Sequence, residues 1–177
     1  MRGRGRERAS SRALLGVAVL GLWNVSGSAR AEAADLKVRL TNAADARAVR
    51  LAVLGAANRL ADSRCQEVLS RFRDASGRTL RTNLEALGQT PSGYLERVWF
   101  YPGSHLQACQ SRRVFAVTAP GSRVVFICLP QFRSHQWTAG ADAEVVIIHE
   151  ALHSLGLGED PPSTEQITYE VQRACAP

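Results

Sequence analysis

The chain has 177 residues and a formal net charge of +6, from 22 basic and 16 acidic side chains. Residues 1–31 contain six arginines and one glutamate, so residues 32–177 keep 16 basic and 15 acidic side chains and are nearly neutral. The charge balance therefore gives no evidence for a nucleic-acid or membrane-surface partner, and we expect neither.

The N-terminal segment has the pattern of a secretory signal peptide. Five arginines in residues 1–12 precede an apolar run over 13–25, and small residues around Ala31 fit a cleavage site. The apolar run is shorter than the roughly 20 residues that a membrane-spanning helix needs. We expect residues 1–31 to be removed and residues 32–177 to form one soluble, monomeric domain, secreted or periplasmic. An uncleaved N-terminal anchor is the alternative.

The chain after the predicted signal peptide begins with a helical pattern of apolar residues. Apolar residues recur at steps of three and four over 43–62, which predicts a helix. Asn42 is suited to cap its first turn. A turn is predicted at 74–79, a short helix at 80–87 and another turn at 89–93. The first helix is the expected scaffold of the core.

Strand signals follow. Residues 96–103 predict one strand, and residues 113–128 predict a hairpin that turns at Ala119-Pro120-Gly121-Ser122. A polar loop containing His135 and Trp137 is expected next.

Two further helices complete the pattern. The first is predicted over 142–156, and Ser163 is suited to cap the second, which ends near Ala174. The order predicts an α+β fold, with a small, mainly antiparallel sheet, a scaffold helix, an active-site helix and a C-terminal helix.

The four cysteines indicate two disulfides, because their number is even and they follow a predicted signal peptide. Three pairings are possible. We predict Cys109–Cys128, which flank the hairpin, and Cys65–Cys175, which would tie the scaffold-helix region to the C-terminal helix.

The stretch "HEALHSLGLGE", residues 149–159, carries the strongest functional signal. On a helix, His149 and His153 lie on one face and can bind one metal ion. Catalytic zinc has three protein ligands and one position for water, and Glu150 is placed to accept a proton from that water. The apolar residues 145–148 indicate a buried helix, where such polar groups are costly without a metal. We therefore predict a Zn²⁺ site with Glu150 as general base, rather than a surface helix with two ordinary histidines.

A third protein ligand is expected just beyond this helix. Gly156 can end the helix because glycine tolerates positive φ, and Glu159 follows six residues after His153. We predict Glu159 as the third ligand. Three nearby carboxylates are the alternatives: Asp160, Glu165 and Glu170.

The stretch resembles the H-E-x-x-H-x-x-G-x-x-H/D signature of metzincin metalloproteases, with Glu159 at the third-ligand position. The match covers eleven residues and departs from the clan in using a glutamate there and in lacking the Met-turn, since Met1 is the only methionine. "VVFICLPQF…AEVVIIHEALHSLG" also resembles the deuterolysin-like aspzincins, although their G-T-x-D motif is absent and Glu165 lies nearest to its position. The ending "HExLHxLGLGExPP…C" resembles uncharacterised bacterial exported proteins. These resemblances imply a zincin metallopeptidase fold.

Two functions are compatible with this pattern. The first is a secreted zinc endopeptidase acting on peptides or proteins, in which Glu150 moves a proton from water to the leaving amine. An exposed edge strand would hold the extended substrate. The second is a non-catalytic exported domain in which the metal and the disulfides stabilise an interaction surface. The intact Glu150 favours the enzyme, because a structural metal needs no base.

Several other residues have two possible roles. Tyr169 would either donate to an oxyanion or pack against the core. Trp99, Phe100 and Tyr101 would either line a substrate cleft or fill the core. His105 and His135 lack ligand spacing and are expected in loops.

Overall fold

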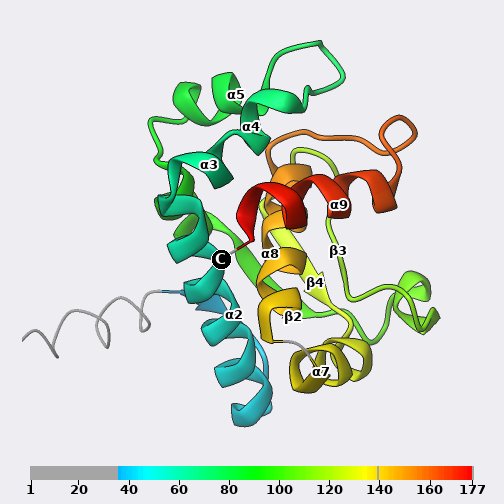
Figure 1. Ribbon diagram of the computed structural model, residues 1–177. Helices are drawn as coiled ribbons and strands as arrows, with labels where there is room; N and C mark the ends of the chain where they lie inside the picture. Colours follow the sequence, from blue (N-terminus) through cyan, green and yellow to red (C-terminus); the bar gives the residue numbers. More distant parts are fainter. Residues whose placement is uncertain (1–35, 139, 177) are drawn as a thin grey trace, which may run out of the picture.

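The computed structural model describes residues 36–138 and 140–176, whose elements are labelled in Figure 1. The predicted signal peptide, residues 1–31, lies outside the described residues. Among the helices of the described chain, none has both the length and the hydropathy needed to cross a membrane.

Helix α2 (Ala43–Ala61) is the predicted scaffold helix. The Asn42 side chain caps it, because its Oδ1 accepts hydrogen bonds from the backbone N–H of Ala44 and Asp45 at 2.9 and 3.1 Å. The buried face of α2 packs against α8 (Gly140–Ser154), which lies beside it in Figure 1. The two helices together form the centre of the hydrophobic core.

The sheet has four strands in the order β1 (Lys37–Val38), β2 (Trp99–Pro102), β4 (Val124–Ile127) and β3 (Ala116–Val117). β1 pairs with β2 and β2 pairs with β4 in parallel, and only β3 and β4 are antiparallel. The α+β class and the hairpin are therefore confirmed, whereas the prediction of a mainly antiparallel sheet is wrong. Long connections, rather than tight hairpins, return the chain to the same end of the sheet before β2 and β4 begin.

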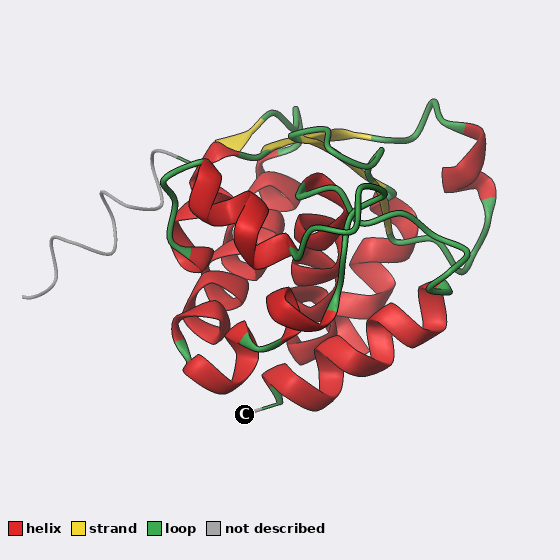
Figure 2. Ribbon diagram, turned by 90° about the horizontal axis from the view of Figure 1, so that it is seen from above, coloured by secondary structure: helices red, strands yellow, loops and turns green. Residues whose placement is uncertain are grey.

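One face of this sheet is covered by helices, as Figure 2 shows. Alternate strand residues point to this face, and Phe100, Val125 and Ile127 are buried there. Trp99 and Tyr101 lie on the opposite face, where their rings stack with centroids 6.2 Å apart. Phe100 therefore belongs to the core and its two neighbours to the outer face.

The remaining elements are mostly short. They are the helices α3 (Ser63–Gln66), α4 (Val68–Arg71), α5 (Leu80–Ala86), α6 (Pro91–Tyr94), α7 (Leu129–Thr138) and α9 (Thr164–Cys175), and the 3₁₀ segments η2 (Leu95–Arg97) and η3 (Gln107–Gln110). Ser163 caps α9 as predicted, because its Oγ accepts from the N–H of Gln166 at 3.3 Å.

Helix α7 replaces the predicted polar loop, so that prediction is wrong. Phe132 is buried in the core, and Arg133 makes a two-point ion pair with Asp45 of α2 at 2.6 and 2.5 Å. These contacts hold the segment against the scaffold helix. The backbone of His135 and Trp137 is therefore helical, and their side chains lie outside the described part of the structure.

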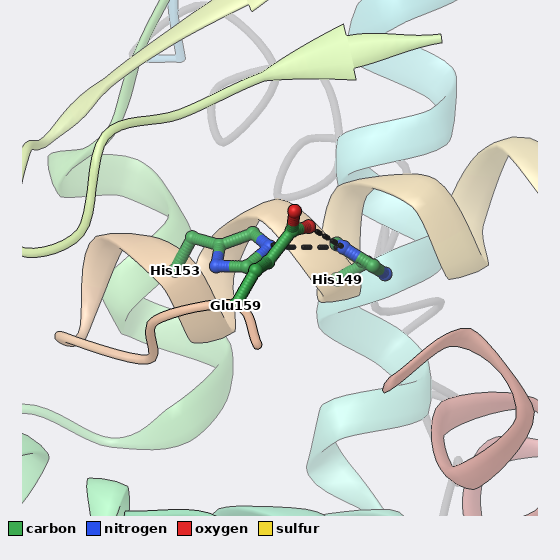
Figure 3. A group of neighbouring side chains, drawn as sticks. All are labelled: His149, His153 and Glu159. Carbon is green, nitrogen blue, oxygen red and sulfur yellow. Dashed lines mark hydrogen bonds and ion pairs between the residues drawn. The ribbon is translucent and has the colours of Figure 1, made fainter. Parts of the chain in front are cut away.

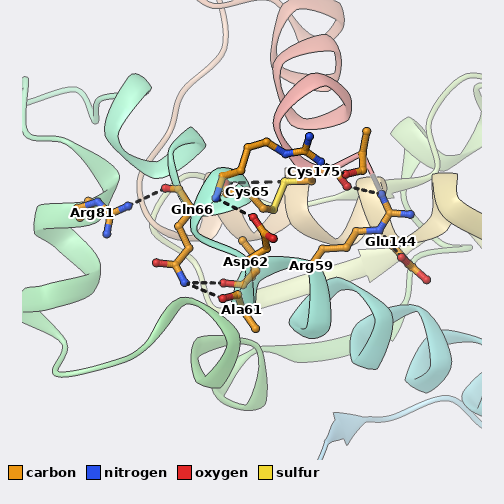
Figure 4. The surroundings of a disulfide bond; sticks show 11 residues. Arg59, Ala61, Asp62, Cys65, Gln66, Arg81, Glu144 and Cys175 are labelled. Carbon is orange, nitrogen blue, oxygen red and sulfur yellow. Dashed lines mark hydrogen bonds and ion pairs between the residues drawn. A yellow bond between two sulfur atoms is a disulfide. The ribbon is translucent and has the colours of Figure 1, made fainter.

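Both predicted disulfides are present. Cys65–Cys175 joins α3 to the last turn of α9, and Cys109–Cys128 joins η3 to the end of β4. Figure 4 shows the surroundings of the first bond, where Arg59 of α2 pairs with Glu144 of α8 and donates to the Cys175 carbonyl at 2.6 Å. The C-terminal helix is thus attached covalently and by hydrogen bonds to the rest of the fold.

Candidate metal centre

Helix α8 ends in a Schellman motif that reverses the chain. The N–H of Leu157 donates to the carbonyl of Leu152 at 3.1 Å, and the N–H of Gly156 donates to the carbonyl of His153 at 2.8 Å. Gly156 has a φ of 111°, which residues with a side chain rarely adopt. This turn directs the following residues back along the helix, so that Glu159 returns to the level of His153.

The backbone carbonyl groups of residues 153–155, at the end of α8, accept hydrogen bonds from other parts of the fold. The Leu155 carbonyl accepts from Asn83 Nδ2 at 2.9 Å, and the Ser154 carbonyl accepts from the Tyr94 hydroxyl at 3.2 Å. The His153 carbonyl also accepts from the N–H of Gly121 in the hairpin turn, at 2.9 Å. Because the last carbonyls of a helix lack donors within the helix, these contacts fix the last turn of α8 in place.

Three side chains converge above this turn, as Figure 3 shows. The Nε2 atoms of His149 and His153 are 3.0 Å apart, and Oε1 of Glu159 lies 3.9 and 3.3 Å from them, respectively. Both histidines are buried, whereas the Glu159 side chain is 46% exposed. The predicted ligand set is therefore brought together, and it could hold a metal ion.

Hydrogen bonds orient both imidazole rings. Nδ1 of His153 lies 2.8 Å from the Leu157 carbonyl, which can only accept, so the neutral ring carries its proton on Nδ1 and its lone pair on Nε2. Nδ1 of His149 lies 3.0 Å from the hydroxyl of Thr168 on α9. Burial, followed by the charge of His153, lowers the pKa of His149 to about 3. Both rings can thus direct a lone pair at one point, as metal-binding histidines do.

The spacing of the three ligand atoms fits a metal ion. A point equidistant from three atoms at these separations lies about 2 Å from each, which is the usual length of a transition-metal bond to nitrogen or carboxylate oxygen. In a metal-free site the two Nε2 atoms can form a hydrogen bond when His149 carries its proton on Nε2, and a metal ion would take the place of that proton. The Thr164 hydroxyl holds Glu159 in this position by donating to Oε1 at 2.7 Å.

Glu150 points to the same region. Its side chain is 6% exposed, and its Oε2 has no hydrogen-bond partner among the described residues. Burial raises the pKa of the Glu150 carboxyl to about 7, the nearby Thr118 hydroxyl lowers it in part, and the charge of Glu159 raises it further. Thr118 is close enough to act on this carboxyl, but the two side chains do not have hydrogen-bonding geometry.

A cavity of about 370 Å³ adjoins the four residues 149, 150, 153 and 159. This volume is in the range of small-molecule and peptide side-chain sites. Its walls come from the β3 hairpin, α8 and the start of α9. Its apolar lining includes Val114, Val117, Pro120, Val145 and Val146.

The alternative third ligands lie elsewhere. Asp160 is exposed beside the two prolines, and Glu165 is exposed in the first turn of α9. Glu170 pairs with Arg71 at 2.7 Å and with Arg173 at 3.1 Å. None of the three belongs to the group formed by His149, His153 and Glu159 within the described chain.

The remaining candidates also lie away from the cavity. Tyr169 is 61% exposed and is not among the residues that line the cavity, so nothing in its position supports oxyanion binding. Trp99 and Tyr101 lie on the outer face of the sheet rather than at the cavity. His105 packs its ring edge-on against Phe126, with centroids 5.8 Å apart.

Three threonines at this site were missed by sequence reasoning. Thr168 contacts His149, Thr164 contacts Glu159, and Thr118 lies near Glu150. Thr164 and Thr168 are four residues apart on α9, a helical spacing that is too common to single out either residue. No local pattern pointed to Thr118.

No family model matches the sequence, and no curated protein or solved structure is significantly similar to it. The chemistry of the site must therefore be inferred from its own geometry.

Proposed function

We propose that the protein is a secreted, zinc-dependent peptidase whose zinc ligands are His149, His153 and Glu159. The proposal is supported chiefly by one observation: three ligand atoms converge beside a buried carboxylate that has no hydrogen-bond partner among the described residues. Two neutral imidazoles and one carboxylate form a donor set that suits catalytic zinc, which keeps a further position for water. The two disulfides are compatible with an oxidising compartment.

Glu150 is the general base in this proposal. A zinc ion would supply a Lewis acid that polarises the peptide carbonyl and acidifies water. Glu150 accepts one proton from the attacking water as the water oxygen bonds to the carbonyl carbon. It then delivers that proton to the amine nitrogen as the C–N bond breaks, and the second water proton passes from the new carboxylic acid to the amine, so the products are a carboxylate and an ammonium group. Glu150 lines the same cavity as the three candidate ligands, so its carboxylate is near the reacting atoms.

Among the described strands β3 lies at the edge of the sheet, and its outer edge offers a place for the peptide. The N–H of Cys128 donates to the Phe115 carbonyl at 3.0 Å, so antiparallel pairing directs Phe115 and Val117 toward β4. The backbone groups of Ala116 and Thr118 consequently point to the free edge, beside the cavity. An extended peptide can pair with these groups and lie across the metal centre.

Cleavage by the Glu150→Gln variant tests this function. Glutamine keeps the size of the side chain but cannot accept a proton, so we expect zinc binding and folding to remain and peptide hydrolysis to fall about 10²–10⁴-fold. Cleavage of a broad peptide library by zinc-loaded wild type and variant is the measurement. Equal cleavage by both proteins would show that Glu150 is not the base. No cleavage by the wild type would favour the non-catalytic, disulfide-stabilised zinc-binding domain.

A further inference from the structure

Two buried polar atoms line the cavity without a hydrogen-bond partner among the described residues. They are Oγ1 of Thr118 and Oε2 of Glu150. Thr118 is 8% exposed and Glu150 is 6% exposed, so solvent at the protein surface does not satisfy them. Buried hydroxyl and carboxylate groups nearly always have a partner, and an exception beside a candidate site calls for a functional explanation.

The fold holds Thr118 at a defined place relative to Glu150. Thr118 directly follows β3, and the turn after it is bonded to α8 through the N–H of Gly121 and the carbonyl of His153, at 2.9 Å. The hairpin that carries Thr118 is therefore attached to the helix that carries Glu150. The Thr118 side chain lies on the same inner face of β3 as buried Ala116, toward the core and α8.

We infer that Thr118 is a further catalytic residue, whose hydroxyl binds the attacking water together with Glu150. This inference rests on the proposed peptidase function. The water donates one hydrogen to Glu150 and the other to Oγ1 of Thr118, so its lone pair is directed at the substrate carbonyl. Proton transfer still goes to Glu150, and Thr118 gains and loses no proton. The cavity has room for a water held by these partners.

The variants Thr118→Val and Thr118→Ser test the inference. Valine keeps the shape but removes the hydroxyl, so we expect kcat to fall about 10–100-fold with KM changed less than about twofold. Serine restores a hydroxyl and should recover most of the activity. The thermal midpoint of Thr118→Val should equal or exceed that of the wild type, because an unpaired buried hydroxyl is replaced by a methyl group.

Thr168→Val is the matched control, at the part of the cavity wall that α9 contributes. It removes the hydroxyl beside Nδ1 of His149, so it should weaken zinc binding about 10–100-fold. Thr118→Val should leave zinc affinity unchanged. Binding of acetohydroxamate to the zinc-loaded protein provides a readout without turnover, because its oxygen takes the place of the water. We expect about tenfold weaker binding to Thr118→Val than to wild type or Thr118→Ser.

These experiments distinguish failure of the peptidase proposal from failure of the Thr118 inference. If the zinc-loaded wild type cleaves no peptide, the peptidase function fails, and acetohydroxamate binding still tests Thr118. The inference is overturned if Thr118→Val cleaves peptides and binds acetohydroxamate as the wild type does. It is also overturned if this variant loses thermal stability and activity together and serine restores neither, because the role of Thr118 is then structural.

Discussion

Removal of the Cys65–Cys175 disulfide should destabilise the protein more than removal of Cys109–Cys128. The first bond joins residues 110 apart and the second joins residues 19 apart. In the chain-entropy relationship these loops correspond to about 4.8 and about 3.2 kcal/mol at 25 °C. All four cysteines are buried, so the cavities left by removing sulfur are similar in the two cases. We therefore expect a difference of about 1.5 kcal/mol in the free energy of unfolding.

Urea unfolding of two double variants, Cys65→Ala/Cys175→Ala and Cys109→Ala/Cys128→Ala, measures this difference. The first double variant should have the lower free energy of unfolding, and its loss would be a large part of the 5–15 kcal/mol typical of a domain. Circular dichroism at the helical band follows the transition. An equal or larger loss in the Cys109–Cys128 double variant would refute the reasoning from loop length.

Two further predictions concern the contacts that support α8. A Cβ at Gly55 would clash with the Glu144 carboxylate, which is restrained by its pairing with Arg59, so Gly55→Ala should lower the free energy of unfolding by about 1–2 kcal/mol in the wild type. In a Glu144→Ala background the clash is absent, so the same substitution should raise the free energy of unfolding by up to about 1 kcal/mol through helix propensity. A thermal double-mutant cycle measures both signs. The side chains of Ser76 and Asn83 and the Arg78 backbone hold the pKa of Asp74 well below its usual range, so its contribution to stability is present above about pH 4 and is lost as pH falls. Acid unfolding of Asp74→Asn should start from lower stability near pH 7 and fall less steeply below pH 4; an unchanged acid limb would contradict this.

Most of the candidate metal centre could be predicted because its parts are close in the sequence. The helical period places His149 and His153 on one face, and Gly156 supplies the positive φ that a Schellman turn requires. Glu159 follows this turn by only a few residues, so the reversed chain brings its side chain close to His153. The three ligand positions depend on one helix end rather than on the rest of the fold.

The sheet could not be predicted from local patterns. Whether β1 and β2 run parallel depends on where the chain between Val38 and Trp99 returns, and that is decided by packing of α2 and the short helices. Helix α7 depends in the same way on tertiary contacts, chiefly the pair between Asp45 and Arg133. The helix or strand propensity of a segment does not depend on such tertiary contacts, so it cannot predict them.

The supporting threonines were also beyond sequence reasoning. Thr118 reaches the centre from the hairpin and Thr168 from α9, and both positions arise from packing of distant segments. Threonine is common in strands and helices, so neither residue stands out in the sequence. Their relevance appears only when burial and hydrogen-bond partners are known.

Zinc titration of the metal-free protein, in competition with a chelator, tests whether His149, His153 and Glu159 form a zinc site. We predict one zinc ion per chain, loss of tight binding in His149→Ala, and substantially weaker binding in Glu159→Ala. Glu165→Ala is the matched control and should bind zinc as the wild type does, because Glu165 lies outside the ligand group. Wild-type affinity in Glu159→Ala together with loss of binding in Glu165→Ala would show that the third ligand is Glu165. No stoichiometric zinc in the wild type would show that these residues form no zinc site.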